Sequence, residues 1–236
     1  MLAWRRFVAC AYCDAEIQLR NGLYSATAFV VAISAAILLA LPAGHFAALL
    51  PAIALNNLAI TSFFFMAALV LLEQSEGSPL ARAVAPLRAG EYLAAKLVTL
   101  AALGVLQHFV LGVLLGVALT QLPLLLLGVA LAAVMLALAG FMLAVRYRSI
   151  NEMLLPAVPW IALLQAPIMG DILGWNSWFV YLHPMQAPIV LMHAAIQGGP
   201  CGHGWQFWYG LGYSLLWIAA MGVFARRSYQ HWEVAT

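Results

Sequence analysis

The residues able to do chemistry in this chain give no means of holding a nucleotide. The sequence has a single lysine, Lys96, and Leu97 follows it. A P-loop needs a glycine-rich turn that ends in lysine and then serine or threonine, because the backbone amides and the lysine hold the phosphates. The sequence has no such motif, so we expect any ATP hydrolysis to belong to another polypeptide.

The cysteines lack the spacing of a metal site. Cys10 and Cys13 form one Cys-x-x-Cys pair. A structural zinc ion needs four ligands, and no second pair follows. Cys201 and His203 are equally isolated, and an odd number of cysteines argues against a disulfide framework. We therefore predict no metal site.

The histidines leave an alternative function open. His108 lies near the middle of a long apolar segment. Histidines in such positions more often hydrogen-bond a neighbouring helix than bind a ligand, and we favour that interpretation. The alternative is a haem-handling or haem-export membrane protein, which would also use the histidines predicted on the outer side: His45, His183, His193 and His203.

Catalytic arrangements have no support in the sequence. No serine, histidine and aspartate stand in a context typical of a triad, and Gly212-Tyr213-Ser214 lacks the flanks of a nucleophile elbow. No span carries a pair of carboxylates. An intramembrane enzyme acting on lipid is a third hypothesis, and the lack of such a pair argues against it. We predict that the chain is not an enzyme.

Composition indicates a membrane protein. The 236 residues are 66% hydrophobic and 8% charged, whereas soluble domains carry about 25% charged residues. So little polar surface cannot cover a globule in water. The net charge of +2 is too small to suggest a nucleic-acid partner. We predict an all-α polytopic protein in contact with lipid.

The chain divides into an N-terminal helix, residues 1–21, and a six-span domain, residues 22–236. In the first segment Trp4, Phe7 and Val8 lie on one face of a helical wheel, and Arg5 and Arg20 lie on the other. This pattern predicts an amphipathic helix at the membrane surface, although Asp14 and Gln18 fall near the edge of the apolar arc. The predicted spans are residues 23–41, 49–72, 97–119, 124–145, 153–169 and 205–225, the fifth broken by Pro156, Pro159 and Pro167.

The distribution of positive charge sets the predicted orientation. With six crossings and a cytoplasmic N-terminus, all ten lysine and arginine residues fall on the cytoplasmic side, as the positive-inside rule requires. A seventh crossing at residues 178–196 would place Arg226 and Arg227 outside. We therefore predict that residues 170–204 form an external re-entrant or surface-lying hairpin, and that both termini are cytoplasmic.

Small residues recur along the third predicted span. Gly104, His108, Gly112 and Gly116 are spaced four residues apart, which places them on one helix face. Small residues at this spacing let helices approach closely. We predict a tight helix contact on this face.

The longest charged interruption between spans is Glu73–Lys96. Pro79 and Pro86 limit any helix inside it to a short piece. Its pattern includes Glu73-x-x-Glu76-Gly77, then Ala85-Pro86-Leu87-Arg88, then Glu91-Tyr92-Leu93 and Lys96. This pattern resembles the first cytosolic loop of ABC-2 type permeases, the membrane subunits of many bacterial ABC exporters, including drug-export permeases of the fluoroquinolone type.

The resemblance implies partners as well as a function. It implies a permease in the bacterial cell (inner) membrane that exports a small hydrophobic or amphipathic molecule such as a drug. It also implies ABC ATPase subunits that bind ATP and magnesium, a second permease copy or paralogue, and no cofactor in this chain. The ATPase would dock on residues 73–96, through Glu73, Glu76, Gly77, Arg82, Pro86, Leu87, Arg88 and Glu91.

The same resemblance implies a substrate cavity lined by the second and fifth spans. Polar and aromatic residues of those spans that would suit an amphipathic molecule are Asn57, Thr61, Phe64, Gln165 and Met169. Polar groups inside hydrocarbon usually face protein or a cavity. Ordinary hydrogen bonding between helices remains an equal alternative for them.

Overall fold

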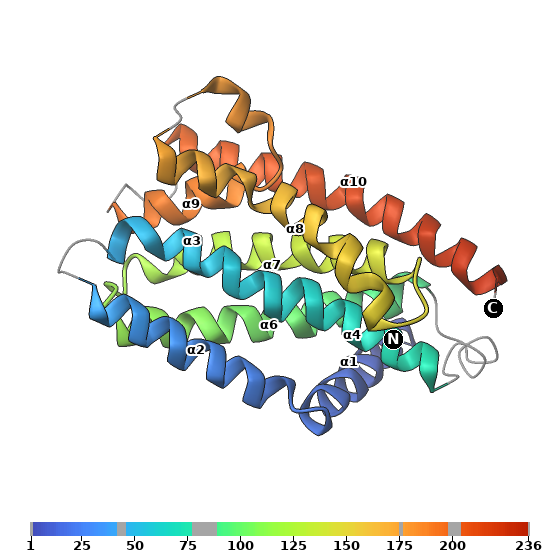
Figure 1. The fold of residues 1–236 in the computed structure, drawn as a ribbon. Coiled ribbons are helices and arrows are strands. Elements are labelled where there is room, and N and C mark those ends of the chain that lie inside the picture. The colour runs from blue at the N-terminus through green and yellow to red at the C-terminus, as the bar shows by residue number, and fades with distance from the viewer. Residues whose placement is uncertain (1, 42–45, 77–88, 175–176, 198–203, 236) are drawn as a thin grey trace.

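The computed structural model describes residues 2–41, 46–76, 89–174, 177–197 and 204–235. These residues are helical with short turns between the helices, and none of them forms a strand (Figure 1). The elements are α1 (Leu2–Arg20), α2 (Leu23–Ala40), α3 (Phe46–Leu58), the π-helix η1 (Ala59–Phe64), α4 (Phe65–Ser75), α6 (Ala89–Leu114), α7 (Leu122–Ala144), α8 (Ile150–Leu173), the 3₁₀ helix η2 (Trp178–Leu182), α9 (Gln186–Ile196) and α10 (Trp205–Ala235).

Six helical segments among these residues are long and apolar enough to cross a membrane. They are Leu23–Ala40, Leu49–Ser75, Gly90–Leu114, Leu122–Ala144, Ile150–Gly170 and Trp205–Tyr229. About 20 residues of helix are needed for one crossing. The prediction of an all-α protein with six spans is confirmed. The third span begins and ends earlier than predicted, at Gly90 and Leu114 rather than at residues 97 and 119.

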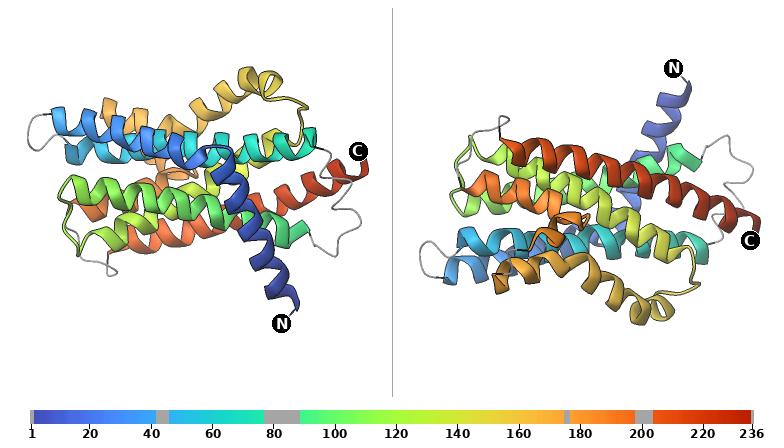
Figure 2. Two further views of the ribbon diagram at one scale, coloured as in Figure 1. Left: turned by 90° about the horizontal axis from the view of Figure 1, so that it is seen from below. Right: turned by 90° about the horizontal axis from the view of Figure 1, so that it is seen from above.

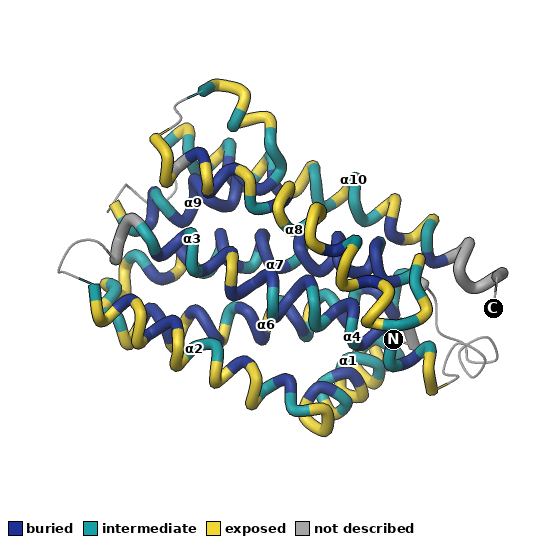
Figure 3. Tube along the Cα trace, in the orientation of Figure 1, coloured by how far each residue is buried: buried dark blue, intermediate teal, exposed yellow. Residues whose placement is uncertain are grey.

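Helix α7 is the centre of the bundle. It packs against α6, α9, α10, α4 and η1, and the tube coloured by burial is dark along most of its length (Figure 3). In the apolar stretch of α7 that could cross a membrane, 78% of the residues are buried, against 11% in the corresponding stretch of α10. A helix that is apolar all round belongs in the interior, and α7 has no charged residue.

The second span is one continuous rod built from α3, η1 and α4. Its π-helical turn contains Thr61, Ser62 and Phe63, all buried. On the facing helix, a Cβ atom built on Gly140 would lie 2.3 Å from the carbonyl oxygen of Phe63. The close contact between α7 and the π-helical turn therefore requires glycine at position 140. The sequence pattern did not predict this turn.

The prediction that prolines break the fifth span is wrong. Helix α8 runs without interruption through Pro156, Pro159 and Pro167, although the ribbon is visibly curved (Figure 1). Proline removes one hydrogen bond and bends a helix. Helices inside membranes tolerate such bends when their surroundings satisfy the freed carbonyl groups.

Helix α1 leaves the bundle at a steep angle (Figure 2). The change of direction occurs at Gly22, whose φ of 73° is in the left-handed region that glycine adopts without strain. Trp4, Val8 and Leu19 are exposed, whereas Asp14 and Gln18 are buried. The surface of α1 that faces the protein is therefore partly polar. That α1 lies at a membrane surface stays a prediction.

The segment predicted as an external hairpin contains the end of α8, η2 and α9. Helix α9 has 11 residues, too few to cross a membrane. It is almost wholly buried between α7 and α10. Two glycines allow this close packing, because Cβ atoms on Gly128 or Gly210 would come within 3.0 Å of α9 atoms. The position of this segment relative to the membrane stays a prediction.

Candidate functional site

A charged cluster is buried where three helices meet. Lys96 on α6 is fully buried, and its Nζ lies 2.7 Å from Oδ1 of Asp14 on α1 and 2.5 Å from Oε1 of Glu73 on α4. The hydroxyl of Tyr92 donates a hydrogen bond to Oε2 of Glu73 at 2.5 Å. We call these four residues the Lys96 cluster.

The Lys96 cluster joins segments that are far apart in the sequence. Asp14 is 82 residues from Lys96, and Glu73 is 23 residues from it. A buried charge is tolerated only when opposite charges and hydrogen bonds compensate for its lost hydration. Each partner therefore constrains the other helices, and α1 is held to α4 and α6 by charges that water does not screen.

Two further contacts hold α1 along α6. Arg6 forms a salt bridge with Glu91 at 3.0 Å near the start of α6. Farther along both helices, Nε2 of Gln18 donates a hydrogen bond to Oγ1 of Thr99 at 3.0 Å. Contacts at Arg6, Asp14 and Gln18 thus occur in the same order along α6. The two helices therefore form one frame.

The residues predicted to couple to an ATPase are divided by the structure. The interruption between the second and third spans is shorter at both ends than the predicted Glu73–Lys96, because α4 continues to Ser75 and α6 begins at Ala89. Glu73 is buried in the Lys96 cluster, Glu91 is half-buried, and Glu76 is exposed at the end of α4. The remaining five lie outside the described residues: Gly77, Arg82, Pro86, Leu87 and Arg88.

Sequence reasoning did not select Lys96, Asp14, Gln18 or Tyr92 as residues of this site. The signal was present but undervalued. Asp14 and Gln18 interrupt the apolar arc of α1, and Lys96 follows the start of a long apolar helix. A polar residue that interrupts an apolar face needs a partner when it is buried. The partners lie on other helices, so only the tertiary structure identifies them.

The five predicted cavity residues do not share a described pocket. Asn57 is buried, and its Oδ1 accepts a hydrogen bond from Ser34 at 2.9 Å, while Thr61 bonds the backbone of its own helix. Phe64 and Gln165 are half-buried, and Met169 is 53% exposed on α8. Hydrogen bonding between helices therefore accounts for the amide oxygen of Asn57 but not for its buried Nδ2, which has no partner. The cavity stays a prediction.

The predicted packing face on α6 is correct in part. A Cβ on Gly104 would lie 2.8 Å from Leu58, and a Cβ on Gly112 would lie 2.7 Å from Leu122, so both positions carry close helix contacts. Gly116 was assigned wrongly. The helix ends at Leu114, and Gly116 is an exposed turn residue with φ of 71° and no atom near its would-be Cβ.

The described histidines and cysteines do not gather into a site. No group of three or more histidine, cysteine, aspartate or glutamate residues in the described ranges could hold a metal ion. His108 is buried, with Nδ1 lying 2.7 Å from the carbonyl oxygen of Gly104. The Nδ1 of His183 accepts a hydrogen bond from the backbone amide of Met185. These contacts suit packing. His45 and His203 lie outside the described residues, and the haem hypothesis stays a prediction.

Cys10 and Cys13 give a test of how α1 lies on the protein. Cys10 is half-buried and Cys13 is exposed. Burial, and then the negative charge of Asp14, raise the pKa of the Cys10 thiol to about 11. Only the thiolate reacts, so at pH 8 roughly one Cys10 side chain in a thousand is reactive if its pKa is about 11.

We expect maleimide at pH 8 to modify Cys13 much faster than Cys10. Mass spectrometry of Cys10→Ser and Cys13→Ser variants, both made with Cys201→Ser, separates the two rates. The Cys10 rate should continue to increase up to a pH near 11. Equal rates at pH 8 would contradict the observed position of α1.

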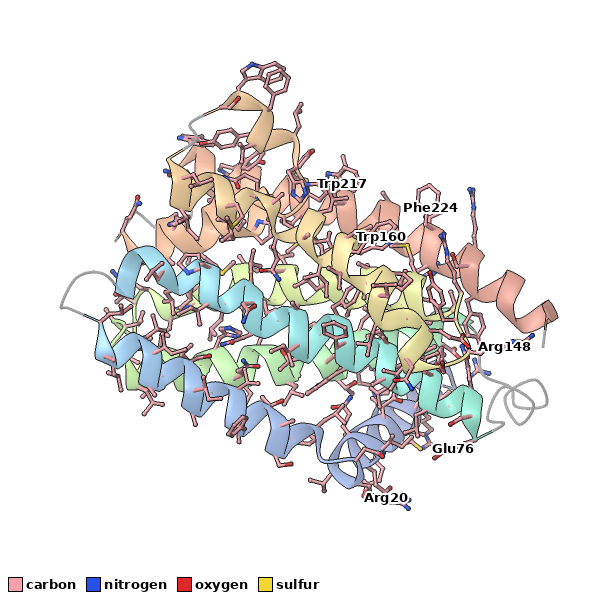
Figure 4. The ribbon with its side chains drawn as sticks, viewed as in Figure 1. Arg20, Glu76, Arg148, Trp160, Trp217 and Phe224 are labelled. Carbon is pink, nitrogen blue, oxygen red and sulfur yellow. The ribbon has the colours of Figure 1, made fainter. Side chains whose placement is uncertain are left out.

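Two apolar grooves open on the surface of the bundle. One, of about 400 Å³, lies between α2 and α6, and the other, of about 360 Å³, lies among α6, α7 and α10 near Arg226. Exposed apolar side chains cover the outer helices, including Trp160 on α8 and Phe224 on α10 (Figure 4). Such faces suit lipid or another membrane helix.

Six apolar helices, five of them around the buried α7, define a multi-pass membrane protein. Helix α1 is held to one end of this bundle by buried charges. The charged frame marks one end of the bundle, where Arg20, Glu76 and Arg148 also lie (Figure 4). Comparison with known protein families then identifies the family of this membrane protein. Residues 5–236 match the model of the Fluoroquinolones export permease protein family, and the chain belongs to that family.

Two curated relatives come from strains of Mycobacterium tuberculosis. Fluoroquinolones export permease protein Rv2687c, from strain H37Rv, and its counterpart MT2761, from strain CDC 1551, are each 30% identical to this chain over 218 residues. The matched region is 92% of this chain and 91% of each relative. No solved structure matches the chain. The family match confirms the resemblance to exporter permeases.

Proposed function

We propose that this chain is the membrane subunit of an ABC exporter and exports a flat, amphipathic drug of the fluoroquinolone kind. The observation that carries the proposal is the family match over nearly the whole chain. The curated relatives are named as permeases for fluoroquinolone export. The sequence has no P-loop, so the energy comes from a separate ATPase subunit that binds ATP and magnesium.

The Lys96 cluster supports a place for that ATPase. It joins α1, the end of α4 and the start of α6, and so flanks residues 77–88 on both sides. A force applied to those residues would reach α1 and two spans together, because the three helices share buried charges. In this mechanism ATP closes the ATPase dimer, the frame moves as a unit, and the pathway opens outward.

The remaining elements of the proposal are the assembly and its location. One chain supplies half of the translocation pathway, and a second copy or a paralogue completes it. The protein lies in the bacterial cell inner membrane. Arg20 and Arg148 lie toward the same end of the bundle (Figure 4), and the positive-inside rule makes that end cytoplasmic. Both termini are then cytoplasmic.

The test of coupling uses the permease purified with its ATPase. We expect Glu76→Ala and Leu87→Ala each to lower drug-stimulated ATP hydrolysis about tenfold, because each removes a docking contact worth on the order of 1.4 kcal/mol. Hydrolysis is measured in proteoliposomes. Glu76 is exposed, so its replacement should not affect folding.

The matched control is Glu152→Gln. Glu152 accepts a backbone hydrogen bond at the start of α8, and glutamine keeps an acceptor there. This variant should hydrolyse ATP like the unmodified complex. Unchanged coupling in both Glu76→Ala and Leu87→Ala would count against docking on this segment.

A further inference from the structure

The groove between α2 and α6 lies outside the second and fifth spans, where the substrate cavity was predicted. Its walls include Thr27, Ala28 and Ala32 from α2, and Leu103, Gln107 and Val110 from α6. Its volume of about 400 Å³ is within the range of pockets that hold drug-sized ligands. The lining of the groove is strongly apolar. Only 28% of the residues in the apolar stretch of α2 are buried, so this groove lies on the outer side of the bundle.

Gln107 is the unusual member of this groove. The residue is 2% exposed, and neither its amide nitrogen Nε2 nor its amide oxygen Oε1 has a hydrogen-bond partner. The nearby hydroxyl of Thr27 does not supply one, because it donates to the carbonyl oxygen of Leu23 on its own helix. A buried amide without partners is costly, and within a membrane span no bulk water compensates for it.

These observations favour one kind of occupant. A hydrocarbon chain of a lipid would fill the groove but would leave both polar atoms of Gln107 unpaired. A helix from a second copy would bring a backbone whose polar groups are already bonded to one another, so it too would leave both polar atoms of Gln107 unpaired. A small molecule with a flat apolar body and one neutral carboxyl or amide group would fill the groove and satisfy both the donor and the acceptor.

We propose that the α2–α6 groove is a membrane-facing binding site for the exported drug, with Gln107 as its polar anchor. This inference rests on the proposed function, since the ligand is the cargo. The neutral carboxyl group of the drug donates its O–H to Oε1 of Gln107 and accepts a hydrogen bond from Nε2. The aromatic body lies between α2 and α6. The cargo enters this site from the lipid before it reaches the pathway between permeases.

The experiment measures binding of a fluorescent fluoroquinolone, ciprofloxacin, to the purified full-length chain in lipid nanodiscs without ATP. Gln107→Leu should weaken binding at least about tenfold, because it removes two hydrogen bonds and keeps the volume. This variant should fold at least as stably as the original, since it removes two unpaired buried atoms. Ala32→Trp should also weaken binding by filling the groove.

Ala36→Trp is the matched control, one turn farther along the exposed face of α2 and outside the groove lining. It should bind ciprofloxacin like the unmodified chain. Unchanged affinity in both Gln107→Leu and Ala32→Trp would overturn the site but not the proposed function. Two other results would also overturn it: a lower dimer fraction in Ala32→Trp, which assigns the groove to a second copy, or a loss of co-purified phospholipid with ciprofloxacin binding unchanged, which assigns it to lipid.

A transport assay distinguishes failure of the groove site from failure of the proposed export function. Ciprofloxacin export by the chain with its ATPase, measured in proteoliposomes, tests the proposed function. Export without measurable binding by the isolated chain would overturn only the groove site. Absence of both binding and export would overturn the proposed function as well.

Discussion

Lys96→Met should lower the free energy of unfolding by about 3–5 kcal/mol, because it leaves two buried carboxylates without their shared cation. Lys96 is fully buried, and its ammonium group contacts both Asp14 and Glu73. The expected result is a lower midpoint of thermal unfolding in nanodiscs, with release of α1 from the bundle. Faster maleimide labelling of Cys10, which lies beside the cluster on α1, should report that release.

Arg6→Met is the matched control for this prediction. It also removes a cation that joins α1 to α6, but the side chains of Arg6 and Glu91 are 29% and 15% exposed. A partly solvated pair of this kind contributes about 1 kcal/mol or less. The triple variant Asp14→Asn, Glu73→Gln, Lys96→Met removes all the charges together and should recover most of the lost stability. If Lys96→Met unfolds like Arg6→Met, the buried cluster does not hold α1.

Gly140→Ala should lower the free energy of unfolding by about 1–3 kcal/mol, the usual range for overpacking a closely packed interior. The new Cβ would lie 2.3 Å from the carbonyl oxygen of Phe63 and 3.1 Å from its Cα. Both are backbone atoms of the π-helical turn, so no side chain can move aside. Either α7 separates from η1 or the turn changes its hydrogen bonding. Thermal unfolding in nanodiscs measures the effect.

Gly212→Ala serves as the comparison. It lies within the span of α10 and has no atom within 4 Å of its would-be Cβ. Alanine favours helix over glycine by up to about 1 kcal/mol, so this variant should be as stable as the original or slightly more so. Equal behaviour of the two variants would mean that the contact between α7 and η1 tolerates a methyl group.

Local pattern was sufficient for the spans. A run of apolar residues long enough to cross a membrane must satisfy its backbone internally, and a helix is the simplest way to do so. That is why α2 and α7 were predicted near their observed limits. Prediction was weaker where packing competes with local preference. The three prolines of α8 did not break it, and the residues of η1 carry no signal of a π-helix.

The same distinction between local pattern and packing applies to the candidate site. By itself the sequence determined that the chain is a six-span helical protein without a nucleotide-binding loop, and that its charge gathers around residues 73–96, because composition and span length act within each segment. Only the tertiary structure decided that Lys96 is an interior residue held by Asp14 and Glu73, and that Gln107 lines an apolar groove with its amide unpaired. Such contacts depend on which helices become neighbours, and the cost of burying charge is set by partners many residues away in the chain.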